Sequence, residues 1–202
     1  MRLLHTGTVP RLIEPVVRAG TLARMRQPVI PVDDHLVLRP WEEADAPAVV
    51  EAFAEPDIQQ WHARSMDASE AVAWIGSWSS TWSAETDACW AIARASDESV
   101  VGRIALRHLC LAAGSAEIGY WVLPHGRRQG AASRATVALS GWAFEELGLH
   151  RLDLLHSVHN QPSCDVAVRA GFVLEGTLRS SSLHRDGWHD MHIHGLVNEA
   201  GA

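Results

Sequence analysis

The stretch that decides the fold runs from Glu117 to Ala135 and reads Glu-Ile-Gly-Tyr-Trp-Val-Leu-Pro-His-Gly-Arg-Arg-Gln-Gly-Ala-Ala-Ser-Arg-Ala. Aromatic and β-branched residues over 118–122 predict a strand, which Pro124 ends because proline cannot donate to a sheet ladder. From Gly130 onward, small and apolar residues recur at helical spacing. The stretch therefore predicts a strand, a basic turn and the start of a helix.

Such a turn can bind a phosphate group. The first N–H groups of a helix have no partner within the helix, and the helix dipole makes that end positive. Residues 130–132 carry no bulk that would cover these amides, while Arg127, Arg128 and Arg134 add positive charge. We therefore expect a pocket for a pyrophosphate, with a solvated charged turn as the competing interpretation.

Two motifs resemble one family. The pattern Arg127-x-x-Gly130-x-Ala132 is similar to the Arg/Gln-x-x-Gly-x-Gly/Ala loop of the GNAT acyltransferase superfamily, and the flanking residues resemble its RimJ/RimL-like branch of ribosomal-protein N-acetyltransferases. A second motif over 160–172, Asn-x-x-Ser-x-x-Val-Ala-x-x-x-Gly-Phe, matches in order and spacing. The chain lacks the NTPase ending Gly-Lys-Ser/Thr and the dinucleotide pattern Gly-x-Gly-x-x-Gly. Acyl-coenzyme A is therefore the expected ligand.

Length and composition indicate one globular domain in 202 residues, of which 47% are hydrophobic and 20% charged. A formal charge of −7 argues against a nucleic-acid partner. The three cysteines form no CxxC pair, which fits a reducing compartment. Because no apolar run is long enough to span a bilayer, we expect a cytoplasmic protein with no membrane contact.

The resemblance covers roughly residues 36–198, which are expected to form the GNAT domain. Residues 1–35 are rich in proline and basic residues, and predict either a docked arm, compatible with a homodimer, or a disordered extension. Strands and helices alternate in the middle of the chain, with hairpins at both ends. This order predicts an α/β (α+β) fold, a mixed and mostly antiparallel sheet of about seven strands with helices on both faces. The last hairpin is predicted from strands over 173–180 and 189–197 that flank Asp186-Gly187, and the capping-box pattern at Asp67 predicts a helix to about Trp82.

By the resemblance, coenzyme A would lie where one strand splays from its neighbour. Main-chain groups of Trp121, Val122 and Leu123 would meet the pantetheine arm. Asn160 would bind the pantetheine amide region, and Arg169 would lie near the nucleotide. The residues implied for the pyrophosphate are Arg127, Arg128, Gln129, Gly130, Ala131, Ala132 and Ser133.

The reaction implied is direct transfer of an acyl group, acetyl above all, from the thioester to an amine in a ternary complex. The N–H of Val122 would stabilise the oxyanion. Ser163 occupies the place of the hydroxyl beside the leaving thiolate, although a helix-cap serine is an equal interpretation. We expect the neighbouring Cys164 to be a buried small apolar residue rather than a nucleophile, because no motif pairs it with a base.

The general base is harder to assign. Some relatives have a glutamate where this chain has Ser182, so His184 is the candidate, with Glu117 or a water chain as alternatives. Trp61 and His62, in a predicted loop, and Glu117 are the expected acceptor-binding residues.

Asp190, His192 and His194 alternate on a predicted strand and share one face. They could bind a metal with His184 or His189, or they could be polar residues of a half-solvated strand. We expect no metal, because no partner motif is present.

The sequence therefore predicts an N-acyltransferase acting on a primary amine of a protein N-terminus or a small molecule. The alternative is a catalytically weak acyl-CoA-binding regulatory protein. It is motivated by the missing glutamate and by Arg128, which replaces the first glycine of the loop.

Overall fold

One eight-stranded sheet organises the molecule in the computed structural model, which describes residues 12–199. The strands are β1 (Ile30–Pro31), β2 (Leu36–Arg39), β3 (Ala88–Arg94), β4 (Val100–Cys110), β5 (Ser115–Val122), β6 (Arg151–Ser157), β7 (Val173–His184) and β8 (Gly187–Val197). The helices are η1 (Glu43–Asp45), α1 (Ala46–Ala54), α2 (Pro56–His62), α3 (Ala68–Ala84), η2 (Pro124–Gly126), α4 (Ala131–Glu145) and α5 (Gln161–Arg169).

The strand order is β1-β2-β3-β4-β5-β6-β8-β7, and every neighbouring pair is antiparallel except β5 and β6. The predicted mixed, mostly antiparallel sheet is therefore confirmed. The sheet has eight strands rather than about seven because β1 pairs with β2 from within the segment expected to be an arm. No helix among residues 12–199 is long and apolar enough to cross a membrane.

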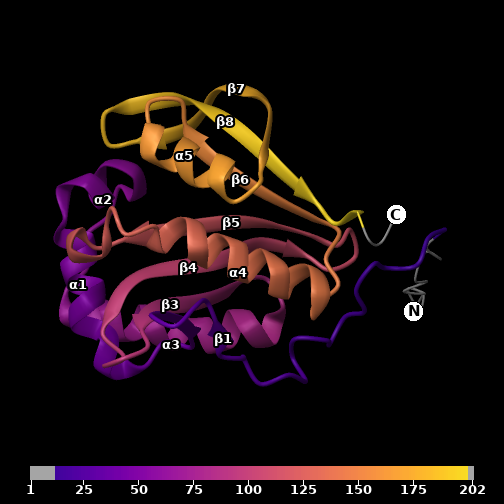
Figure 1. Cartoon of the computed structure of the whole chain (residues 1–202), viewed down its shortest axis with the longest axis horizontal. Helices are drawn as coiled ribbons and strands as arrows, with labels where there is room; N and C mark the ends of the chain where they lie inside the picture. Colours follow the sequence, from indigo (N-terminus) through magenta and orange to yellow (C-terminus); the bar gives the residue numbers. More distant parts are fainter. Residues whose placement is uncertain (1–11, 200–202) are drawn as a thin grey trace, which may run out of the picture.

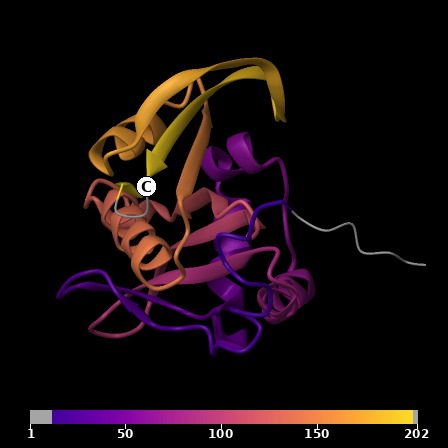
Figure 2. The ribbon, with the colours of Figure 1, turned by 90° about the vertical axis from the view of Figure 1, so that its right-hand side faces the viewer.

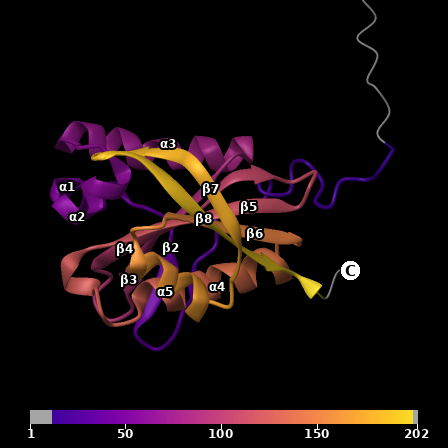
Figure 3. The same cartoon turned by 90° about the horizontal axis from the view of Figure 1, so that it is seen from above.

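Helices cover both faces of the sheet, as predicted. Helices α4 and α5 lie on one face, and α1, α2 and α3 lie on the other (Figures 1 and 3). Strand β5 contributes to both cores because its side chains alternate. Ile118 packs in the core under α4, whereas Trp121 packs with Phe53 and Ile75 in the second core.

The β7–β8 hairpin arches over the top of the molecule toward α2 (Figure 2). Both strands are longer than the predicted 173–180 and 189–197, and they meet at the expected turn before Gly187. Gln60 Nε2 of α2 donates to Asp186 Oδ1 at 2.6 Å, and the Arg185 N–H donates to the Gln60 carbonyl. The hairpin tip is therefore held against the helix that carries Trp61 and His62.

Residues 16–31 pack on the body of the domain, whereas Leu12 and Ile13 are exposed. The N–H groups of Val16 and Val17 donate to the carbonyls of Ala112 and Leu111 in the turn after β4, and Leu22 is fully buried. The indole N–H groups of Trp82 and Trp90 donate to main-chain carbonyls of this segment at 2.9 Å. Residues 16–31 are therefore docked on the body. Residues 1–11 lie outside the described residues, and the division at residue 35 stays a prediction.

Glu85 fixes this segment to the body. Its carboxylate accepts hydrogen bonds from the N–H groups of Gly20, Leu22 and Ala23 at 2.6, 2.7 and 3.2 Å. Burial alone would raise the pKa of Glu85. The three N–H donors lower it, and the net result is a pKa below its ordinary value. Glu85 is therefore charged at neutral pH and caps a turn made by a distant part of the chain.

We expect Glu85→Gln to lower the free energy of unfolding by about 1–2 kcal/mol, because hydrogen bonds to a charged acceptor are lost or weakened. Urea unfolding would measure the change, with the exposed Glu146→Gln at the end of α4 as the matched control. Equal stabilities of the two variants would contradict the role given to Glu85.

Candidate active site

The parallel pair β5–β6 comes apart in the middle of the sheet. Residues 115–118 of β5 pair with 151–154 of β6, and the pairing stops there. Residues 119–122 continue to pair with β4, while residues 155–157 continue to pair with β8. Figure 1 shows β6 diverging from β5 toward the end of the molecule where α2 lies. We call residues 119–122 and 155–157 the parted strands.

Only one of the three expected main-chain groups faces the parted side. The N–H of Leu123 donates to the Val101 carbonyl of β4 at 2.9 Å, and the Trp121 carbonyl lies against Gly102 of β4. Because main-chain groups of successive residues in a strand point to opposite sides, the N–H of Val122 points away from β4. The N–H of Leu123 and the carbonyl of Trp121 are therefore turned toward β4, whereas Val122 has the expected orientation; the contacts of these residues with a pantetheine arm stay predictions.

The loop after β5 leads into the start of α4 at this same end. Gly130 is the N-cap, with φ of +73°, and the first helical bond runs from the Arg134 N–H to the Gly130 carbonyl. The N–H groups of residues 131–133 therefore have no partner within the helix. Arg134 makes an ion pair with Asp33, which holds its side chain beside the loop.

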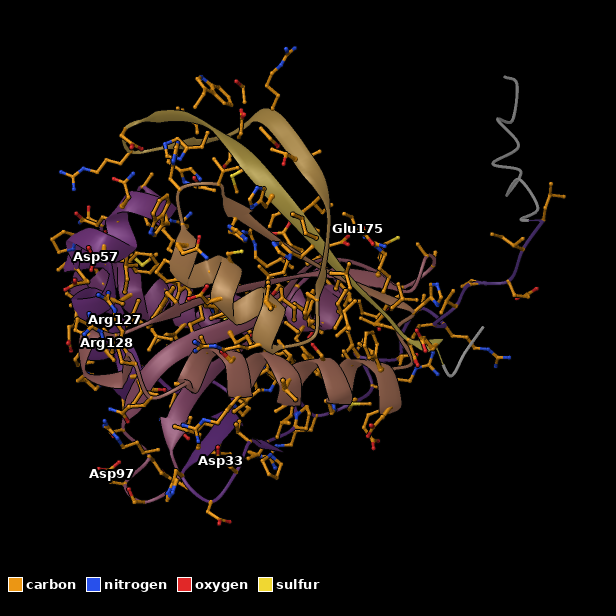
Figure 4. The ribbon with its side chains drawn as sticks, turned by 45° about the horizontal axis from the view of Figure 1, so that its top comes forward. Asp33, Asp57, Asp97, Arg127, Arg128 and Glu175 are labelled. Atoms are coloured by element: carbon orange, nitrogen blue, oxygen red, sulfur yellow. The ribbon has the colours of Figure 1, made fainter. Side chains whose placement is uncertain are left out.

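The side chain of Arg127 has partners within the protein that the sequence did not predict, and its contact with a pyrophosphate stays a prediction. Its guanidinium lies 2.7 Å from Asp57 and 3.6 Å from Glu55, and its Nε donates to the Val122 carbonyl at 3.1 Å. Figure 4 shows Asp57 and Arg127 at the same end of the molecule as Arg128. Arg127 therefore ties α2 to β5, and its charge is already neutralised by the two carboxylates.

Arg128 and Gln129 are exposed in this loop. Arg128 has φ of +59°, a left-handed conformation that glycine adopts without strain. The replacement of the first glycine of the family pattern by Arg128 therefore leaves the turn intact and adds an accessible charge.

Sequence reasoning missed Tyr120, whose hydroxyl lies 2.6 Å from Ser163 Oγ at the start of α5. Burial raises the pKa of Tyr120 to about 12, so its hydroxyl is protonated at neutral pH. Asn160 caps α5 by accepting from the Ser163 N–H at 3.2 Å, which leaves its amide N–H groups as donors. The alternation of side chains along β5 could have predicted this role for Tyr120, since it places Tyr120 and Val122 on the face that α5 covers.

The expected acceptor residues Trp61 and His62 lie on α2, not in a loop. The ring of Trp61 packs against His184 at 5.4 Å between centroids. His62 packs against Phe53. Burial and the nearby Arg103 lower the pKa of His62 to about 4, although a hydrogen bond with the main chain of Tyr120 raises it. His62 therefore lies beside the parted part of β5 and is neutral.

His184 lies at the end of β7 and is largely buried. Its Nδ1 is 3.1 Å from the Trp61 carbonyl, which can only accept, so Nδ1 carries the proton. Its Nε2 therefore has a free lone pair and no partner among the described residues. Burial lowers the pKa of His184, which keeps the ring neutral at neutral pH.

Glu117 and Arg169, two residues predicted for the site, lie away from Val122 and at the end of α5, respectively. Glu117 pairs with Asp153 in the joined part of the strands and lies 4.0 Å from His108. Five residues of extended strand, about 16 Å, separate Glu117 from Val122, so Glu117 does not lie beside Val122. Its contact with the acceptor stays a prediction. Arg169 is exposed at the end of α5, and its contact with the nucleotide stays a prediction.

The metal site considered with His184 or His189 is not assembled as the sequence suggested. Asp190 accepts from the Ser180 N–H, and His189 lies between Asp186 and Ser157, at 2.9 and 2.7 Å. His192 and His194 instead face His156 and Cys164. Cys164 is partly exposed rather than buried as expected.

Comparisons with known proteins agree with this geometry. The family model described as an acetyltransferase (GNAT) domain matches residues 35–173. The uncharacterized N-acetyltransferase YoaA of Bacillus subtilis (strain 168) is 26% identical over 166 residues, which are 81% of this chain and 94% of that protein. The ribosomal-protein-serine acetyltransferase of Escherichia coli (strain K12) is 30% identical over 101 residues, 50% of this chain and 56% of that protein.

A solved structure of RimL, a ribosomal L7/L12 alpha-N-protein acetyltransferase in complex with coenzyme A, has the same fold. The TM-score is 0.78 at 23% identity, over 86% of this chain and 99% of that one. The family model spans well over half of the sequence and includes the parted strands and the loop before α4. The chain therefore belongs to the GNAT acetyltransferase family.

Proposed function

We propose that this protein is an N-acyltransferase that moves an acetyl or other acyl group from acyl-coenzyme A to a primary amine in a ternary complex. One observation carries the proposal: the pairing of β5 and β6 ends at Ile118 and Leu154, and the Val122 N–H faces the parted side. Membership of the family supports acyl-coenzyme A as the donor.

The pyrophosphate would bind the exposed turn at 128–130 and the free N–H groups of residues 131–133. Arg128 supplies the accessible charge, while Arg127 holds α2 in place. The pantetheine arm would then lie along the parted strands, with the amide of Asn160 within the same region.

The amine attacks the thioester carbon, and the carbon–sulfur bond breaks as the amide forms. The Val122 N–H would stabilise the negative charge on the thioester oxygen, a contribution of about 2.7–4 kcal/mol to the barrier in other enzymes. Ser163 Oγ would accept a hydrogen bond from Tyr120 and present its own proton to the leaving sulfur. The amine proton would pass to Nε2 of His184, directly or through water.

The acceptor is a primary amine of a protein N-terminus or a small molecule, approaching from the α2 side, where Trp61 and His62 lie. The net charge of −7 favours a basic acceptor. The E. coli relative is named for ribosomal-protein serine acetylation, which supports a protein N-terminus and a cytoplasmic setting. A homodimer remains part of the proposal on the basis of the N-terminal extension in the sequence.

We expect Gly130→Asp to weaken acetyl-coenzyme A binding at least tenfold, because a carboxylate beside the free N–H groups repels the pyrophosphate. Gly130→Asn is the matched control, since asparagine has the same shape and also tolerates the left-handed backbone at this position. Isothermal titration would compare the two. Equal affinities for Asn and Asp would contradict the phosphate site.

We expect Ser163→Ala to lower kcat by about 10²-fold or more, with acetyl-coenzyme A affinity nearly unchanged. Tyr120→Phe should lower kcat less, and the double variant should be no slower than Ser163→Ala, because the two hydroxyls act through one hydrogen bond. Coenzyme A release with a panel of amines would measure this. Additive losses would contradict the relay, and binding without turnover on every amine would favour the weakly catalytic regulatory protein.

We expect kcat/KM to fall on acidification with a midpoint below 6.5, because burial lowers the pKa of His184 and only its neutral form accepts a proton. His184→Gln should remove this acid limb. His62→Gln should leave it, since the pKa of His62 is about 4. An unchanged acid limb in His184→Gln would reject His184 as the base.

A further inference from the structure

We infer that this protein binds one zinc ion through three histidines and a cysteine between α5, β6 and β8. The ligands are His156 of β6, His192 and His194 of β8, and Cys164 of α5, whose candidate ligand atoms all lie within 4.8 Å of one another. The inference does not depend on the proposed acyl transfer.

The sheet register places the three imidazoles together. His156 lies directly opposite His192 in the antiparallel β6–β8 pair, and His194 lies two residues further along the same face of β8. The ring centroids of His156 lie 5.3 Å from His192 and 5.0 Å from His194. Helix α5 then brings Cys164 to this face from its first turn.

His156 is oriented as a metal ligand would be. Its Nδ1 is 2.8 Å from the Ser157 carbonyl, which can only accept, so Nδ1 carries the hydrogen and Nε2 has a lone pair. Ligating histidines usually donate their other ring N–H in this way. Its Nε2 lies 3.1 Å from Nε2 of His194, which in a metal-free protein would have to donate to it.

Two further ring nitrogens lack partners. Nδ1 of His192 and Nδ1 of His194 are buried with no hydrogen-bond partner among the residues described by the structure. His194 is only 1% exposed. Because buried polar atoms are rarely left unpaired, Nδ1 of His192 indicates that the cluster has a ligand. One ion binds only one nitrogen of His194, so the facing Nε2 atoms of His156 and His194 are the second indication.

The donor set identifies the ion. Three imidazole nitrogens and one thiolate suit tetrahedral zinc, while the absence of a carboxylate from the cluster disfavours magnesium and calcium. Neighbouring ligand atoms of a tetrahedral zinc site are separated by roughly 3.3–3.7 Å, so small side-chain rotations would close this cluster. Cys164 and His192 are partly exposed and provide a route for the ion.

Zinc bound here would link the first turn of α5 to β6 and β8. That turn carries Ser163, whose hydroxyl contacts Tyr120 across the parted strands. The ion would therefore fix the position of Ser163 relative to β5 without touching the reacting atoms.

Metal analysis of the full chain, purified without a histidine tag, tests the inference. After chelator treatment and desalting, Zn²⁺ titrated against a chromophoric competitor should bind with a stoichiometry near one and a Kd below about 1 μM. Co²⁺ should give a sulfur-to-cobalt charge-transfer band together with weaker visible bands of a tetrahedral site.

Cys164→Ala should lower Zn²⁺ affinity at least tenfold and remove the charge-transfer band, and His194→Gln should lower affinity similarly. Cys110→Ala, an exposed cysteine at the end of β4, is the control and should bind as the parent does. Zn²⁺ should raise the Tm of the parent and of this control, but not of Cys164→Ala. If His194→Gln fails to fold, the Co²⁺ spectra of the parent and Cys164→Ala still decide.

Two results would overturn the inference. A stoichiometry below about 0.2 at micromolar Zn²⁺ would leave only a neutral hydrogen-bonded pair of His156 and His194. Zinc binding with equal affinity in the parent and Cys164→Ala would place the ion at other histidines.

Discussion

The central constraint is that β6 pairs with β5 over only part of its length, while it pairs with β8 over all of it. Along residues 151–154 it pairs with both β5 and β8, and beyond them it keeps only β8. Strand β5 likewise keeps only β4, so the Val122 main chain on the parted side has no strand partner. A main-chain N–H that is left unpaired inside a sheet is costly unless a ligand or water satisfies it, which is why this place suits a thioester oxygen.

Contacts on both faces fix the parted strands. On one face, Trp121 packs against Phe53 and Trp41, and Arg127 binds the carboxylates of α2. On the other face, Tyr120 reaches Ser163 of α5. The packing contacts that stabilise the fold therefore also position the candidate reacting groups. Few residues serve the site alone.

Local patterns predicted most elements because capping residues, glycines and alternation act over a few residues. The helix from Asp67, the strand before Pro124 and the hairpin at Gly187 all follow from such signals. Helix α2 and strand β1 were missed, since both are short and are held by tertiary contacts. The loop before α4 was located correctly, but the partners of Arg127 and the contact of Tyr120 with Ser163 join residues far apart in the chain. No local pattern encodes such contacts, and the cluster of His156 with Cys164 was missed for the same reason.

A crystal structure of the protein with a non-hydrolysable acetyl-coenzyme A analogue tests the central claim most directly. The account predicts the pantetheine arm between residues 119–122 and 155–157, with the carbonyl oxygen of the analogue about 3 Å from the Val122 nitrogen. An analogue bound elsewhere, or parted strands that stay empty at millimolar concentrations of the analogue, would contradict it.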